Sequence, residues 1–168
     1  MKTFKRILSV ISVCAILCAL SGCNRVVRVA DAINWEIQAK QIANEQAEII
    51  LDCLKTGNSE KLEALFCKNV SSSHDLKTEI AEAIEFIDGN IIDDGSWFGL
   101  SSADKSVDNG KTTKLNIRPG MHKVKTDTGK EYNIRFVNYL IYEEDPDNVG
   151  ITYITIRKGN DSITVGGL

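Results

Sequence analysis

The stretch Lys130-Glu-Tyr-Asn-Ile-Arg-Phe-Val-Asn-Tyr-Leu-Ile-Tyr142 decides the fold class. Its side chains alternate with a period of two, which is the period of a β-strand. One face of the predicted strand receives Tyr132, Ile134, Phe136, Asn138, Leu140 and Tyr142. The opposite face receives Asn133, Arg135, Val137, Tyr139 and Ile141.

Further strands are predicted on both sides of this stretch. Asp127-Thr128-Gly129 is a turn signal that joins it to residues 122–126 in a hairpin. Downstream, the turn at residues 145–148 leads into strands at 149–157 and 162–165. Upstream, we expect strands at 112–118, closed by Pro119-Gly120, and within 91–100, interrupted by Asp93-Asp94-Gly95.

Before Gly89 the apolar residues recur at helical spacing instead. Helices are predicted at residues 31–55 and 59–66, and a third helix is capped by Ser73 or Asp75 and runs to Ile87. The run Ser71-Ser72-Ser73 is expected to break the chain between the second and third helices. Three helices followed by a meander of strands is an α+β order, with antiparallel strands and the helices on one face.

The N-terminus has the three parts of an export signal. Lys2, Lys5 and Arg6 precede 14 uncharged residues, 7–20, which are fewer than the about 20 that a membrane span needs. Leu20-Ser21-Gly22-Cys23 then resembles the lipobox of bacterial prolipoproteins, in which the cysteine receives a diacylglycerol and cleavage occurs just before it. The competing interpretation is a plain signal peptide with an incidental cysteine. We expect a signal peptide (1–22), a lipidated Cys23 with a tether (23–30) and a single domain (31–168).

This organisation predicts a protein held on the outer face of the cell membrane by lipid chains, since two acyl chains anchor a protein stably. Residues 1–22 hold three of the 20 Lys and Arg and none of the 23 Asp and Glu, so residues 23–168 carry a net charge of −6. A net negative charge argues against nucleic acid as a partner and against spreading on anionic lipid. The sequence does not identify the type of bacterial envelope.

The second predicted helix carries a family resemblance. Residues 55–66, Lys-Thr-Gly-Asn-Ser-Glu-Lys-Leu-Glu-Ala-Leu-Phe, resemble the opening of nuclear transport factor 2-like domains, and small bacterial lipoproteins with a domain of unknown function look similar. Phe86-Ile87-Asp88-Gly89, the hairpin 126–132 and Gly150-Ile151 also fit. The resemblance implies a cone in which three helices pack on a curved antiparallel sheet. It leaves the function open, because that fold hosts isomerases, dehydratases, transport adaptors and binding modules.

Few residues suggest catalysis. His74 and His122 lie in no acid–base pairing and lack metal-ligand spacing, so we expect no catalytic residue, metal or cofactor. The acidic runs 93–94 and 143–147 match no calcium-loop signature and are interpreted as solvated turns. Cys53 and Cys67 are either bridged or free and buried, and the second alternative is favoured.

The strongest site candidates are aromatic. Trp97 and Phe98 stand between loop-forming residues, and Tyr139 or Tyr142 is expected nearby. We therefore predict a non-catalytic, lipid-anchored module that binds a small molecule or an envelope protein at these residues. The alternatives are a small-pocket enzyme of the cone fold and a homodimeric assembly subunit.

Overall fold

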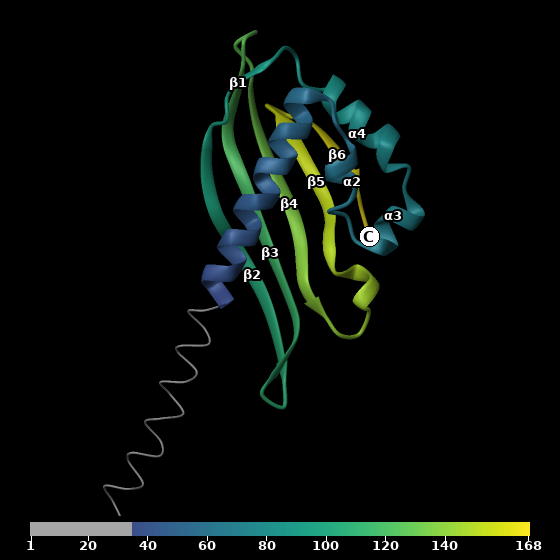
Figure 1. Cartoon of the computed structure of the whole chain (residues 1–168). Coiled ribbons are helices and arrows are strands. Elements are labelled where there is room, and N and C mark those ends of the chain that lie inside the picture. The colour runs from purple at the N-terminus through teal and green to yellow at the C-terminus, as the bar shows by residue number, and fades with distance from the viewer. Residues whose placement is uncertain (1–34) are drawn as a thin grey trace, which may run out of the picture. The chain divides into compact units, whose positions relative to one another are not determined.

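The computed structural model describes residues 35–168 (Figure 1). For residues 98–102 it describes the backbone alone. The predicted signal peptide, Cys23 and the tether lie outside the described residues. The chain divides into two units, 1–38 and 39–168. Of the first unit only residues 35–38 are described, and they are helical.

The residues described before the sheet contain four helical segments. The first helix covers residues 35–56, and α2 (Glu60–Glu63), α3 (Lys68–Ser73) and α4 (Leu76–Glu85) follow. Asp75 caps α4, since its carboxylate accepts hydrogen bonds from the Thr78 amide (3.2 Å) and hydroxyl (2.8 Å). These contacts lower the pKa of Asp75, the hydroxyl contact most strongly. The cap predicted from the sequence at this position is therefore present.

The run of three serines does not break the chain as predicted. Ser71, Ser72 and Ser73 form the end of α3, and their hydroxyls donate to the carbonyl oxygens four residues earlier, at 3.1, 2.7 and 2.7 Å. Serine side chains can satisfy a helical backbone in this way, although the same ability favours caps and turns elsewhere.

All six named strands pair antiparallel in one sheet of order β1-β3-β4-β5-β6, with β2 also paired to β3. The strands are β1 (Ile91–Asp93), β2 (Ser96–Asp108), β3 (Lys111–Thr126), β4 (Glu131–Tyr142), β5 (Gly150–Lys158) and β6 (Asp161–Gly166). A short 3-10 helix, η1 (Pro146–Asn148), connects β4 to β5.

The hairpin of β2 and β3 departs most from the prediction. β2 extends through residues that were expected to be loop, and Asn109 and Gly110, with φ of 47° and 83°, form the two-residue turn into β3. Pro119 does not end its strand: it lies within β3 opposite Leu100, and the β2–β3 register shifts on both sides of that pair. A proline has no N–H to donate, so strands accommodate it at such irregularities.

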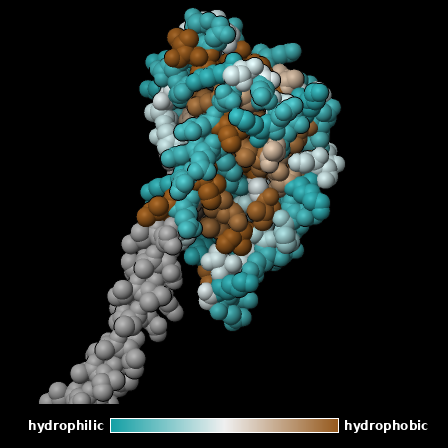
Figure 2. Space-filling view, viewed as in Figure 1, coloured by the Kyte–Doolittle hydropathy of each residue, from teal (hydrophilic) through white to brown (hydrophobic). Residues whose placement is uncertain are grey.

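One face of the sheet, here called the helix face, forms the core with the helices. Directly paired residues share a face, and the pairs Met121–Ile134 and Phe136–Ile154 are all buried in the core cluster. The helices contribute Ala47, Ile50, Leu51, Cys53, Leu54, Leu62, Val70, Leu76, Ile80 and Ala83. Figure 2 views the molecule from the side of the first helix, where a hydrophobic area lies beside that helix among hydrophilic residues.

The opposite face of the sheet, here called the open face, carries Arg118, Arg135, Tyr153 and Arg157, all of them exposed. Its residues alternate with those of the helix face along β4 and β5. Successive residues of these strands therefore alternate between a buried apolar face and an exposed polar face.

The predicted fold class is wrong. The structure is not a nuclear transport factor 2-like cone with three helices on a curved sheet: within residues 35–168, four helical segments precede a large antiparallel sheet. The prediction failed because the serine run and Pro119-Gly120 were interpreted as breaks, and because polar residues 101–110 show no apolar alternation.

Candidate functional site

The sheet separates the aromatic residues that the sequence predicted to lie together. Trp97 pairs with Met121, is half-buried and packs against the core on the helix face. It lines a hollow of about 280 Å³ with Ala47, Leu51 and Asp94. Trp97 and Phe98 belong to strand β2 and not to a loop, and the Phe98 side chain lies outside the described part of the structure.

Tyr139 and Tyr142 do meet. Their rings stack with centroids 5.1 Å apart, and the Lys114 Nζ lies 4.3 Å from the Tyr142 centroid and 5.2 Å from that of Tyr139. The Tyr142 hydroxyl, as a hydrogen-bond partner, raises the pKa of the Lys114 amine. Strict alternation would place these tyrosines on opposite faces, but a register shift between Leu115 and Asn116 on β3 brings them together.

Tyr139 lines one end of a groove on the open face, here called the open-face groove. It consists of three adjoining hollows of about 110, 330 and 350 Å³, and Thr155 lines all of them. The smallest hollow is lined by His122, Asn133, Arg135, Thr155 and Arg157. Arg118, Val137 and Tyr153 line both larger hollows, and Tyr139 lines the largest. The groove thus crosses strands β3, β4, β5 and β6 without involving Trp97.

The lining of the groove is basic. It includes three arginines and a histidine, and none of the described lining residues is Asp or Glu. The whole chain has a net charge of −3, so this face departs from the charge of the molecule. Arg118 forms an ion pair with Asp104 (2.7 Å) at the margin of the groove.

Hydrogen bonds fix several polar side chains of the groove. His122 Nδ1 lies 2.7 Å from Asn133 Oδ1, and that oxygen also accepts from the Lys123 amide at 3.4 Å. The hydroxyls of Thr155 and Thr164 are 3.2 Å apart across β5 and β6. The hydrogen-bond donors and acceptors of the groove are therefore fixed in place on a sheet. Such an arrangement favours a preformed binding site over one that closes around its ligand.

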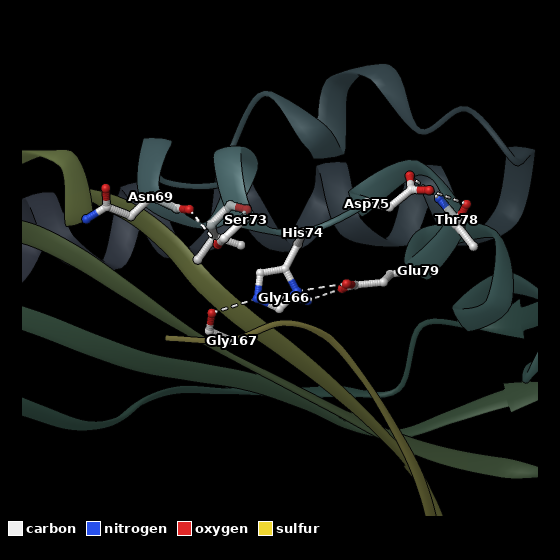
Figure 3. A network of polar contacts seen from close by, with 9 residues as sticks. Asn69, Ser73, His74, Asp75, Thr78, Glu79, Gly166 and Gly167 are labelled. Carbon is white, nitrogen blue, oxygen red and sulfur yellow. Dashed lines mark hydrogen bonds and ion pairs between the residues drawn. The ribbon is translucent and has the colours of Figure 1, made fainter.

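A network of polar contacts holds the chain end that lines the groove. Figure 3 shows His74 between Glu79 and Gly167: its Nδ1 is 2.8 Å from Glu79 Oε1 and its Nε2 is 2.9 Å from the Gly167 carbonyl. Glu79 Oε2 also accepts from the Gly166 amide. Gly167 and Leu168 line the largest hollow of the groove, so this network positions one end of it.

The ring of His74 faces two acceptors. A neutral imidazole has one N–H, whereas the imidazolium has two and can donate to both partners. The hydrogen bond to Glu79 is the main cause that raises the pKa of His74, and partial burial opposes it. From the sequence, His74 was expected to lie in no acid–base pairing, and its contact with Glu79 corrects that expectation because a neighbour five residues along the chain reaches its ring.

The thiols are buried and free. Cys53 and Cys67 are both unbridged, as favoured from the sequence. Burial, with Asp52 and Glu63 nearby, raises the pKa of Cys53 to about 11, so its thiolate is scarce at neutral pH.

Within residues 35–168, no group of three His, Cys, Asp or Glu is placed to hold a metal ion. The same residues contain no helix long and apolar enough to cross a membrane.

Comparison with known proteins gives a family without an assigned activity. Residues 49–162 match the family described as "Domain of unknown function (DUF5104)". This range starts within the first helix, ends in β6, and includes the groove residues from Arg118 to Arg157. None of the curated proteins compared with the chain matches it.

Proposed function

Since the chain belongs to the DUF5104 family of domains of unknown function, we propose a function from its site: a lipid-anchored envelope protein that binds a ligand non-catalytically in the open-face groove. The anchor follows from Leu20-Ser21-Gly22-Cys23 and the uncharged stretch before it. Lipid on Cys23 would hold the domain at the outer face of the membrane.

The continuity of the groove carries the binding part of the proposal. Thr155 lines all three hollows, and the tyrosine and arginine side chains come from adjacent strands of a rigid sheet. A concave site with an apolar floor, such as Val137, and a few placed polar groups is the usual form of a ligand pocket.

The chemistry of the groove supports binding over catalysis. General acid–base catalysis commonly uses a histidine oriented by a carboxylate or a carboxyl group tuned by burial. The histidine of the groove, His122, contacts the amide of Asn133, and no described lining residue carries a side-chain carboxylate. A homodimer through this face has less support, because three arginines from each copy would oppose one another.

The anchor is tested in the native host. Wild-type protein is expected in the membrane fraction with a lipid-modified Cys23 at its N-terminus, detected by mass spectrometry of the mature chain. Cys23→Ala should lose the modification and leave that fraction. Equal recovery of both proteins in the membrane fraction would contradict the anchor.

The binding site is tested by filling the groove. Thr155→Trp places a large ring where the three hollows adjoin, and Thr112→Trp, on β3 outside the groove, is the matched control. Each purified protein is incubated with an envelope extract of the host, and bound small molecules are identified by mass spectrometry. A compound retained by wild type and Thr112→Trp but not by Thr155→Trp supports the proposal. Equal retention by all three folded proteins would overturn it.

A further inference from the structure

Three arginines lie along a diagonal of the open face. Gly120 of β3 pairs with Arg135 of β4, which places Arg118, two residues from Gly120, diagonally beside Arg135. Asn133 pairs with Arg157 of β5, so Arg157 is the diagonal neighbour of Arg135 on the other side. Diagonal neighbours on one sheet face have Cα atoms about 7–8 Å apart, within reach of long side chains.

The arginines make this part of the groove positively charged. Guanidinium groups on neighbouring strands of one face can be approached together by a single anionic ligand. The ion pair of Arg118 with Asp104 lies at one end of the diagonal, and both side chains are at least half exposed. A bound anion would be attracted to the guanidinium groups along the diagonal.

The residue type narrows the class of anion. The guanidinium fork matches the geometry of carboxylate and phosphate groups and donates two parallel hydrogen bonds to them. His122 adds a ring to the smallest hollow, where Arg135 and Arg157 meet. Beyond this end, Tyr153 and Val137 offer an uncharged surface to the rest of a ligand.

We infer that the open-face groove binds an oxyanion, a phosphate or a carboxylate, between Arg135 and Arg157, with the uncharged body of the same ligand lying against Tyr153. The inference rests on the proposed function and specifies the ligand class of the same groove. Arg118 adds a third positive charge, beside the body of the ligand, so ligands with two anionic groups bind more tightly than those with one.

The test compares three sugars of matched size. Glucose 6-phosphate, glucuronate and glucose are titrated into the purified full-length lipoprotein in nonionic detergent, and heats of binding are measured at two salt concentrations. One or both anionic sugars should bind and glucose should not, and added salt should weaken the binding. Binding of only one anionic sugar identifies phosphate or carboxylate as the preferred group.

Two variants locate the anion. Arg135→Gln and Arg157→Gln should each weaken binding about tenfold or more, since each removes a charge-assisted hydrogen bond. Lys77→Ala, on the exposed side of α4, removes a positive charge elsewhere and should leave the affinity unchanged. Arg157→Lys keeps the charge without the fork and should lie between wild type and Arg157→Gln.

Three results would overturn the inference: no binding of either anionic sugar, equal binding of glucose, or equal losses in Lys77→Ala and the arginine variants. These results are separate from a failure of the proposed function. If Thr155→Trp blocks a neutral compound from the envelope extract, the groove is a binding site and only its assigned ligand class is wrong.

Discussion

Two successive residues of strand β4, Arg135 and Phe136, lie on opposite faces of the sheet in different environments. The Phe136 side chain is fully buried on the helix face, packed with the helices, whereas Arg135 is exposed on the open face beside two other arginines. The helix face holds apolar area removed from water, which is the main source of folding free energy. The open face concentrates positive charges on exposed side chains. The comparison thus sets a face that forms the core against the face on which we propose a binding site.

The largest expected effect distinguishes the two faces through separate alanine substitutions of Phe136 and Arg135. Phe136→Ala should lower the free energy of unfolding by about 3–5 kcal/mol, because it leaves a cavity in the core. Arg135→Ala should change it by no more than about 0.5 kcal/mol, as for other exposed positions. Chemical denaturation of both proteins measures the contrast, and comparable losses would show that the open face also maintains the fold.

Trp97 tests the boundary of the helix face. Its ring is half-buried against the core, so Trp97→Ala should cost about 2 kcal/mol, less than a fully buried aromatic residue. Trp35→Phe isolates its fluorescence, which a soluble quencher should reduce in part. A cost near zero with complete quenching would place the ring in solvent and restore it as an exposed contact residue.

Gly166 tests how the chain end is positioned beside the groove. Its φ is +72°, and a Cβ there would lie 2.8 Å from the Thr152 carbonyl oxygen and 2.9 Å from Phe66. Gly166→Ala should therefore destabilise the protein by about 1–2 kcal/mol. Gly129→Ala, at a φ of +78° with open space around it, is the control for backbone strain alone. Equal losses in melting temperature would exclude a contribution from packing at Gly166.

His74 contributes a smaller, pH-dependent effect. Because its pKa is raised in the folded state, its stabilisation is fully present below the ordinary histidine pKa of about 6.5 and is lost as pH rises through the folded value. The melting temperature of wild type relative to His74→Asn should thus fall from pH 5.5 to pH 8.5. His122→Asn is the matched control. A constant difference between wild type and His74→Asn would contradict the pairing with Glu79.

The sequence predicted local signals better than their assembly. The Asp75 cap and the turn at residues 127–129 depend on near neighbours, and both are present. Asn109-Gly110 is an equally strong hairpin signal, and recognising it would have extended the prediction to β2. Pro119 is the opposite case, since the irregular pairing with β2 that accommodates it depends on another strand.

The candidate site was predicted less well for the same reason. Arg135, Tyr139, Tyr153 and Arg157 all occur at alternating positions of predicted strands, so the alternation was a signal for a shared face. Which strands lie side by side depends on register, which the sequence does not state. The stacking of Tyr139 on Tyr142 depends on a register shift and could not follow from strict alternation.

The buried cysteines provide an internal measure of how often the core opens. A thiol with a pKa of about 11 is ionised in about one molecule in a thousand at pH 8, and Cys53 is also almost completely shielded from reagents. Alkylation of Cys53 therefore has to wait for the helix that carries it to leave the core. Labelling rates measured by mass spectrometry would report how often this happens, with no change to the sequence of the protein.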